Sequence, residues 1–181
     1  MSDFSRKIYI LCPLLLIVSF LTDQLTKYLA LTKLPGHPIS LISGILSFTY
    51  LENRGVGFGM LQNRLYIILI VNALILAAIL YLFIKMPKEK RFLPVYILMT
   101  LVVSGALGNI IDRLRLGYVV DFIYIELIDF PIFNVADIYV SVSIFIFAFF
   151  ALFKYKSEDL NYLFTLTKEE TNNQNGDEQD E

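Results

Sequence analysis

The sequence has a single cysteine and a single histidine, which restricts the chemistry open to it. Cys12 alone cannot form an internal disulfide or a cysteine cluster for a metal ion. His37 lies in a loop between glycine and proline, and no second histidine exists to complete a zinc site. Ser104 likewise has no histidine partner to activate it as a nucleophile. We therefore expect no metal, no cofactor, and no serine- or cysteine-based hydrolysis.

Four long apolar runs of the chain lack any charged residue. Leu65 to Ile84 and Phe92 to Ile111 are each 20 residues long, which at about 1.5 Å per residue matches the ~30 Å hydrocarbon core of a bilayer. Ile8 to Thr22 and Ile138 to Phe153 are shorter, and become long enough if the helices continue through their polar ends. With a mean hydropathy of +0.63, the sequence predicts a mainly α membrane protein. The four predicted transmembrane helices cover about residues 8–27, 65–84, 92–111 and 137–153.

The formal net charge of −2 is set by the C-terminal end of the chain. Residues 157–181 carry eight acidic residues against Lys168, and without them the chain has 14 basic and 9 acidic residues, a net charge of +5. The final stretch, KEETNNQNGDEQDE, includes no apolar residue and is typical of a disordered tail. We predict a membrane domain over residues 1–156 and an acidic, largely disordered cytoplasmic tail over residues 157–181.

Basic residues next to the ends of the predicted helices indicate their orientation. Lysine and arginine cluster at residues 6–7, 85–91 and 154–156, which four spans would bring to one side. The positive-inside rule makes this side cytoplasmic. The N-terminal stretch resembles a signal peptide, but no small-residue cleavage site follows it, so we interpret it as a retained membrane anchor. Both termini are therefore predicted in the cytoplasm, with residues 23–64 and 112–137 on the outer face.

The first outer segment has the character of strands and turns. ISGILSFTYLEN (residues 42–53) is rich in β-branched and aromatic residues and predicts a strand pair or small sheet at the membrane interface. A glycine-rich loop follows, in which Gly55, Gly57 and Gly59 allow tight turns or a close approach of another chain. This loop lacks the glycine spacing and the βαβ context of a dinucleotide site.

Acidic and amide side chains gather at the outer ends of the spans, although ionisable groups at membrane depth are costly. Some of them have a purely structural interpretation when taken singly. Asp137 could cap the fourth helix, Asp23 and Lys27 could form an ion pair four residues apart, and Asp112 could pair with Arg113. The full set of acids and amides is Asp23, Asn53, Asn109, Asp112, Asp121, Asn134 and Asp137.

Asp121 fits no capping pattern, because apolar residues flank it on both sides. Sixteen residues separate it from Asp137, and Pro131 argues against one straight helix between them. A short outer loop or helix between them that folds back over the surface could bring the two carboxylates side by side. Such a pair shares one proton, so the ionised member can activate water while the protonated member donates to an amide carbonyl. This chemistry would be that of a peptidase without a metal or a covalent nucleophile.

Four motifs, in order, resemble those of the lipoprotein signal peptidases (signal peptidase II), the membrane aspartic peptidases of bacteria. They are TDQLTK (residues 22–27), ENRGVGFG (52–59), GALGNIIDRLRLGYVVDFI (105–123) and FNVAD (133–137). The match runs from about Leu21 to Val142, across a chain with four predicted spans.

The resemblance implies roles for individual positions. Asp121 and Asp137 match the catalytic aspartates of the family, and Asp112 would support them without itself being catalytic. Gly55 belongs to the glycine-rich loop near the site. The other matching polar positions, which would orient the substrate backbone or support the dyad, are Asp23, Lys27, Asn53, Asn109, Arg113 and Asn134.

The resemblance also implies a substrate and a location. The substrate would be a prolipoprotein whose cysteine already carries diacylglyceryl, and the cut would fall just before that cysteine. The enzyme would lie in the bacterial inner membrane, in contact with phospholipid, with its active site near the outer leaflet. We expect it to act as a monomer, to bind no nucleic acid and to be inhibited by globomycin.

The sequence departs from the family in the glycine-rich loop, where N-x-G-A-A-F is common and this chain has Asn53-Arg-Gly-Val-Gly-Phe58. Arg54 places a bulky charge there, facing either lipid head groups or substrate. Three other classes compete with the peptidase interpretation. A transporter would suggest internal repeats, which are not evident; a presenilin-type protease would need a Gly-x-Gly-Asp motif, which is absent; and a purely structural protein would leave the pair of Asp121 and Asp137 unexplained.

Overall fold

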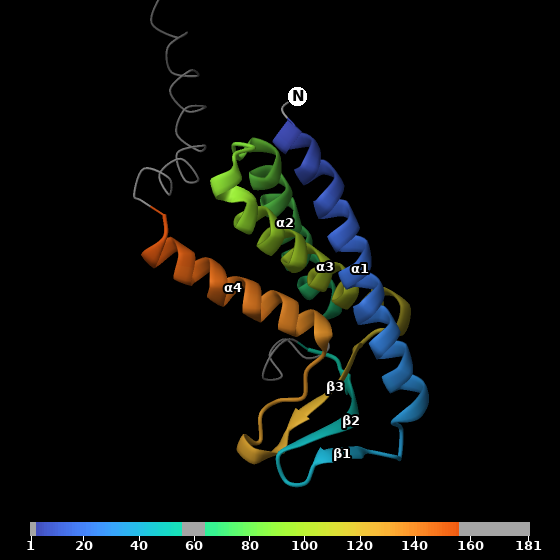
Figure 1. The fold of residues 1–181 in the computed structure, drawn as a ribbon. Helices are drawn as coiled ribbons and strands as arrows, with labels where there is room; N and C mark the ends of the chain where they lie inside the picture. The colour runs from blue at the N-terminus through green and yellow to red at the C-terminus, as the bar shows by residue number, and fades with distance from the viewer. Residues whose placement is uncertain (1–2, 56–63, 156–181) are drawn as a thin grey trace, which may run out of the picture.

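The computed structural model describes residues 3–55 and 64–155. Four helices in these ranges are long and apolar enough to cross a membrane, and a three-stranded antiparallel sheet lies at one end of them (Figure 1). The predicted mainly α membrane fold with a small β-rich element is confirmed. The predictions for Gly57, Gly59 and the acidic tail from residue 157 onward lie outside the described residues.

The four helices are α1 (Asp3–Lys33), α2 (Leu65–Lys85), α3 (Leu93–Leu116) and α4 (Val135–Phe153). α1 contains 31 residues, which is about 46 Å at 1.5 Å per residue, so its last turns extend beyond a bilayer core and lie beside the sheet (Figure 1). A 3-10 turn, η2 (Lys90–Phe92), leads directly into α3, whose first turn contains Pro94. Proline is tolerated there because the N–H that it lacks has no helical partner in a first turn.

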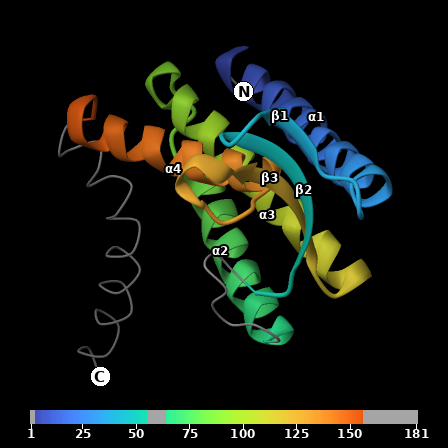
Figure 2. The ribbon, with the colours of Figure 1, turned by 90° about the horizontal axis from the view of Figure 1, so that it is seen from below.

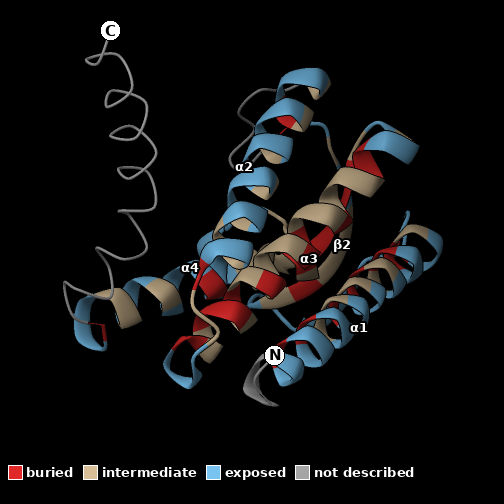
Figure 3. Ribbon diagram, turned by 90° about the horizontal axis from the view of Figure 1, so that it is seen from above, coloured by how far each residue is buried: buried red, intermediate tan, exposed pale blue. Residues whose placement is uncertain are grey.

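α3 is the centre of the helix bundle. α1 and α4 pack along it and α2 packs against it, which explains why α3 carries buried residues from its first turn to its last (Figure 3). Gly105 on α3 lets α4 come close, because a Cβ at this position would lie only 2.6 Å from the backbone oxygen of Ala136. The contact between α3 and α4 therefore depends on the absence of a side chain at residue 105.

α2 is exposed along most of its length (Figure 3). Ile68 is the only buried residue among its 21 described positions, while apolar side chains such as Leu74 and Leu80 are more than half exposed. A helix that is apolar on all sides is not compatible with an aqueous surface, and its exposed faces are suited to lipid.

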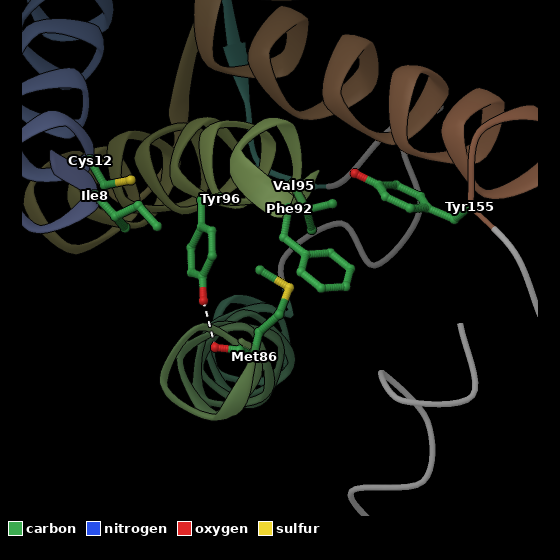
Figure 4. Close-up of a cluster of buried hydrophobic side chains, with 7 residues drawn as sticks. All are labelled: Ile8, Cys12, Met86, Phe92, Val95, Tyr96 and Tyr155. Carbon is green, nitrogen blue, oxygen red and sulfur yellow. Dashed lines mark hydrogen bonds between the residues drawn. The ribbon is translucent and has the colours of Figure 1, made fainter. Parts of the chain in front are cut away.

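A cluster of buried side chains closes the end of the bundle that is opposite the sheet. It joins α1, α3 and the chain after α2 and α4, and Cys12 is one of its packing residues (Figure 4). The Tyr96 hydroxyl donates a 2.7 Å hydrogen bond to the Met86 carbonyl, and the Tyr155 hydroxyl donates to the Arg91 carbonyl. These bonds satisfy polar groups that would otherwise be buried without partners.

The sheet has the strand order β1-β2-β3, with β1 (Ile39–Ile42), β2 (Leu46–Asn53) and β3 (Val119–Ile125). β2 lies within the segment predicted to form strands, residues 42–53, whereas β1 precedes it and shares only Ile42 with it. The sequence does not predict β3, which contains Asp121 and pairs antiparallel with β2, with Leu51 opposite Asp121. α3 ends at Gly117, whose φ of +82° is left-handed, so β3 runs beside β2 beneath the helices (Figure 2).

The chain between β3 and α4 folds back onto β3. After a 3-10 turn, η3 (Glu126–Ile128), Phe133 donates a backbone hydrogen bond to Ile123 and accepts one from it, at 3.0 and 2.8 Å. This bridge places Asn134 and the first turn of α4 next to the middle of β3. The predicted loop between the two aspartates therefore returns the chain to its starting point, so that the polar side chains of β3 and α4 meet.

Candidate active site

Asp121 on β3 and Asp137 in the first turn of α4 are joined by one asparagine. The Asn134 side chain donates a 2.6 Å hydrogen bond to Asp121 Oδ1, and the Asn134 backbone N–H donates to Asp137 Oδ2 at 3.1 Å. Asp121 is only 1% exposed, whereas Asp137 is partly accessible. The two carboxylates that the sequence singles out therefore lie in one hydrogen-bonded cluster.

Asp137 is also part of a capping box. Asn134 is the N-cap of α4, its Oδ1 accepts a bond from the Asp137 backbone N–H, and the Asp137 carboxylate accepts the bond from Asn134 N–H in return. Asp137 therefore takes part in capping α4, as its structural interpretation predicts. The N-cap residue itself, however, is Asn134. A carboxylate in the first turn of a helix also interacts favourably with the helix dipole.

Asp121 accepts hydrogen bonds at both oxygens. Asn53 Nδ2 on β2 donates to Oδ2 at 2.8 Å, and Asn134 donates to Oδ1. Burial raises the pKa of Asp121 to about 7, the charge of Asp137 adds to the rise, and the two amide hydrogen bonds oppose it. A raised pKa favours the protonated form of Asp121, which is the form that paired acid and base chemistry requires of the acid.

A second buried cluster lies behind the aspartates. Lys27 Nζ on α1 lies 3.0 Å from Asp23 Oδ2 and 3.1 Å from Asp112 Oδ2 on α3. Asp23 Oδ1 accepts the backbone N–H of Ala136, and Asp112 Oδ2 accepts that of Val120. One lysine and two carboxylates thus join α1, α3, α4 and β3, and the predicted pair of Asp23 and Lys27 exists as part of this larger set.

Gly108 on α3 provides the space for this cluster. A Cβ at residue 108 would overlap Asp23 Oδ2. Gln24 completes the cluster, because its Nε2 lies 3.2 Å from Asp23 Oδ2 and 3.3 Å from Asp112 Oδ1. Gln24 is not among the residues predicted for the site, although it lies within the TDQLTK motif; its only signal in the sequence is its place beside Asp23.

Arg113 and Asp112 do not form the pair that their adjacency suggests. Arg113 Nη2 donates instead to the backbone oxygen of Gly55 at 2.8 Å, while Asp112 turns to Lys27. Asn53 Oδ1 accepts the Gly55 N–H at 2.9 Å. Arg113 and Asn53 therefore hold the start of the glycine-rich loop against the aspartates, and Gly55 is connected to the site through its backbone.

Arg54 points along the sheet. Its guanidinium lies 2.8 Å from Glu52 Oε2 and over the ring of Tyr118, 5.4 Å from the ring centroid. The side chain is more than half exposed, so its charge is available to solvent or lipid head groups.

Asn109 on α3 connects the two clusters, because its Oδ1 accepts a hydrogen bond from Lys27 Nζ and its Nδ2 donates one to Asp137 Oδ1. All ten residues proposed for the site lie in these two clusters. Among the described residues no group of three or more histidine, cysteine, aspartate or glutamate side chains is arranged to hold a metal ion. What the clusters offer is a pair of carboxylates, one buried and one partly open, each held by fixed amide donors. This arrangement can polarise a water molecule and protonate a carbonyl oxygen.

Comparisons with known proteins agree with the motifs. A family model described as signal peptidase (SPase) II matches residues 15–153, a range that includes the whole site. The lipoprotein signal peptidase of Clostridium novyi (strain NT) is 41% identical over 143 residues, which cover 77% of this chain and 95% of that protein. The lipoprotein signal peptidase of Streptococcus thermophilus (strain CNRZ 1066) is 38% identical over 140 residues, covering 77% and 89%.

The fold also resembles two solved bacterial membrane enzyme structures, both determined by the in meso method. The one at 2.3 Å resolution superposes with a TM-score of 0.72 and 33% identity, covering 78% of this chain and 87% of that chain. The one at 1.9 Å resolution gives a TM-score of 0.70 and 34% identity, covering 80% and 94%.

Proposed function

Because the chain belongs to the signal peptidase II family, we propose that it is an aspartic endopeptidase that removes the signal peptide from diacylglyceryl-modified prolipoproteins. The cut falls on the N-terminal side of the lipidated cysteine. The observation that carries the proposal is the hydrogen-bonded connection of Asp121 and Asp137 through Asn134.

Asp137 is the base in this mechanism and Asp121 is the acid. Asp137 accepts a proton from water as the water oxygen attacks the scissile carbonyl, and Asp121 gives its proton to the carbonyl oxygen. The tetrahedral intermediate collapses when Asp121 takes that proton back and Asp137 protonates the leaving nitrogen. The raised pKa of Asp121, caused first by burial and then by the charge of Asp137, supports its role as the acid.

The substrate reaches the site from the membrane. The dyad lies at the end of four apolar helices beside the sheet, so the signal peptide can lie among the helices while the lipid tails stay in the bilayer. We place the enzyme in the bacterial inner membrane as a monomer surrounded by phospholipid, with both termini in the cytoplasm and the dyad near the outer leaflet. Globomycin is expected to compete with the precursor.

A cleavage assay with purified enzyme tests the proposal. We expect the diacylglyceryl-modified precursor to be cut at least ~10-fold faster than the same precursor without the lipid, because binding energy from the lipid contributes to the transition state. Mass spectrometry of the product should give the lipidated cysteine as its first residue. A precursor with serine in place of that cysteine is the control. Equal rates for all three substrates, or a cut at another bond, would refute lipid-dependent recognition.

The pH dependence of kcat/KM should report the ionisation of the catalytic acid, Asp121. Asp121 must be protonated, and its pKa is raised to about 7 by burial and by Asp137, so activity should decline as the pH rises through this value. The fall at one pH unit above that pKa should be ~10-fold. The assay is run on lipidated precursor from about pH 6 to pH 9, with circular dichroism to show that the enzyme stays folded. A rate that is constant up to the alkaline end would exclude Asp121 as the acid.

A further inference from the structure

Lys27 makes three polar contacts, none of them with the dyad. Its Nζ lies 3.0 Å from Asp23 Oδ2, 3.1 Å from Asp112 Oδ2 and 2.7 Å from Asn109 Oδ1. An ammonium group has three N–H donors and no acceptor, so these contacts use its full capacity. Lys27 is also only 2% exposed. It therefore has neither a free donor nor an accessible surface for substrate.

The contact with Asn109 determines the direction of an amide. Because ammonium can only donate, the Asn109 atom that faces Lys27 must be the carbonyl oxygen, and the NH₂ group must point the other way. That NH₂ group donates to Asp137 Oδ1 at 3.0 Å. The same Asn109 oxygen also accepts a 3.2 Å bond from Asn134 Nδ2. If the Asn109 amide were reversed, its NH₂ group would face the donors of Lys27 and Asn134. Its carbonyl oxygen would then face the Asp137 carboxylate.

We propose that Lys27 is a positioning residue: it locks the Asn109 amide in the one orientation that offers a hydrogen-bond donor to Asp137, and so holds this carboxylate in place to activate water. The inference rests on the proposed function and assigns Lys27 to orientation of the dyad instead of substrate binding. The two carboxylates beside it, Asp23 and Asp112, offset the cost of burying its charge. Their own bonds to Ala136 and Val120 N–H fix them to α4 and β3.

Lys27 also acts on Asp121 through its charge. Burial and Asp137 raise the pKa of Asp121, and the positive charge of Lys27 opposes this rise. Removing the ammonium should therefore make Asp121 harder to ionise. The charged groups packed round Asp121 are Asp137 on α4, Lys27 on α1 and Arg113 on α3, with Asp23 and Asp112 beyond Lys27.

Kinetics of Lys27→Met on lipidated precursor test the proposal. We expect kcat to fall about 10- to 100-fold, the loss associated with a misplaced catalytic group, while KM changes less than ~2-fold because Lys27 touches no substrate. The alkaline limb of the pH profile should move to higher pH. The matched control is Lys33→Met, the same change at an exposed position on the same helix, which should leave all three quantities unchanged.

A variant that keeps the lysine separates orientation from folding. Asn109→Asp preserves an oxygen for Lys27 but replaces the donor to Asp137 with a second oxygen. We expect a folded protein with kcat about 100-fold lower at neutral pH. If Lys27→Met does not fold, this variant alone decides, and wild-type kcat in Asn109→Asp would overturn the inference.

Infrared spectroscopy gives a readout that needs no turnover. A carboxylic acid band that is absent in Asp121→Asn belongs to Asp121, and it should persist to higher pH in Lys27→Met than in the wild type. An unchanged band together with unchanged kcat per folded molecule would refute a positioning role. Failure of the wild type to cleave lipidated precursor would instead refute the proposed function, because the infrared comparison does not depend on it.

Discussion

Replacing either Asp121 or Asp137 with asparagine should reduce cleavage of a lipidated precursor by about 100- to 10 000-fold, the range associated with loss of a general acid or base. Asparagine has nearly the shape of aspartate but cannot exchange a proton with water or with the leaving nitrogen. Both variants should still insert and fold, because the contacts of the apolar helices are unchanged. Rates are measured on purified protein in single-turnover reactions, with membrane insertion assessed by extraction.

The two variants should differ in stability. Asp121 accepts bonds from Asn53 and Asn134, so in Asp121→Asn one of these donors would face the NH₂ group of the introduced amide. The raised pKa of Asp121, due mainly to burial, means that wild-type stability falls as the pH rises from about 4 to about 7. An amide does not ionise, so the disadvantage of Asp121→Asn should shrink over this range and stay constant above it. Asp137→Asn keeps the buried Asp121, so its stability should still fall with rising pH, but over a narrower range, because the charge of Asp137 no longer adds to the rise of the Asp121 pKa.

Asp129→Asn is the matched control for both changes. Asp129 is exposed on the same outer connection and has a φ of +48°, a backbone conformation that asparagine accepts readily. Its activity should equal that of the wild type. Full activity in Asp121→Asn or Asp137→Asn would refute the dyad, whatever the control shows.

Replacing Asp23 with alanine should produce a large loss of stability. The change leaves Lys27 with one carboxylate in a buried place and removes the acceptor of the Ala136 N–H in α4. Breaking one side of a buried ion pair typically costs about 3–5 kcal/mol of unfolding free energy. Thermal unfolding in detergent, followed by circular dichroism, measures the effect.

The control is an ion pair at the surface. Glu89 and Arg91 lie 2.8 Å apart with about half of each side chain exposed, and such pairs contribute about 0–1 kcal/mol. Glu89→Ala should therefore shift the unfolding temperature far less than Asp23→Ala does. Equal shifts in the two variants would show that the buried cluster does not stabilise the bundle.

The membrane helices could be predicted because long runs without charge have few alternatives in a folded chain. The sequence could not predict β3 in the same way. Val119 to Ile125 is buried at its first four positions and lacks the alternation of a half-buried strand. Its partner, β2, lies more than 60 residues earlier in the chain, so nothing local indicates the pairing.

The motifs predict which residues belong to the site, but the partners of these residues depend on helix packing. Asp112 and Arg113 are adjacent in sequence, yet one turns to α1 and the other to the glycine-rich loop. Neighbours on a helix point about 100° apart, so their partners come from different elements. Gln24 remained unselected for the same reason, because its contacts with Gly108 and Asp112 come from α3.

The Asn134 side chain both caps α4 and binds Asp121. Its amide oxygen caps the helix, while its amide nitrogen donates a hydrogen bond to Asp121. The Asp137 carboxylate, which completes the capping box, is the group that would activate water. The first turn of α4 and the geometry of the proposed dyad therefore depend on the same side chain. A molecule that clamps the two aspartates should, as a result, also protect the amide hydrogens of the first turn of α4 from exchange.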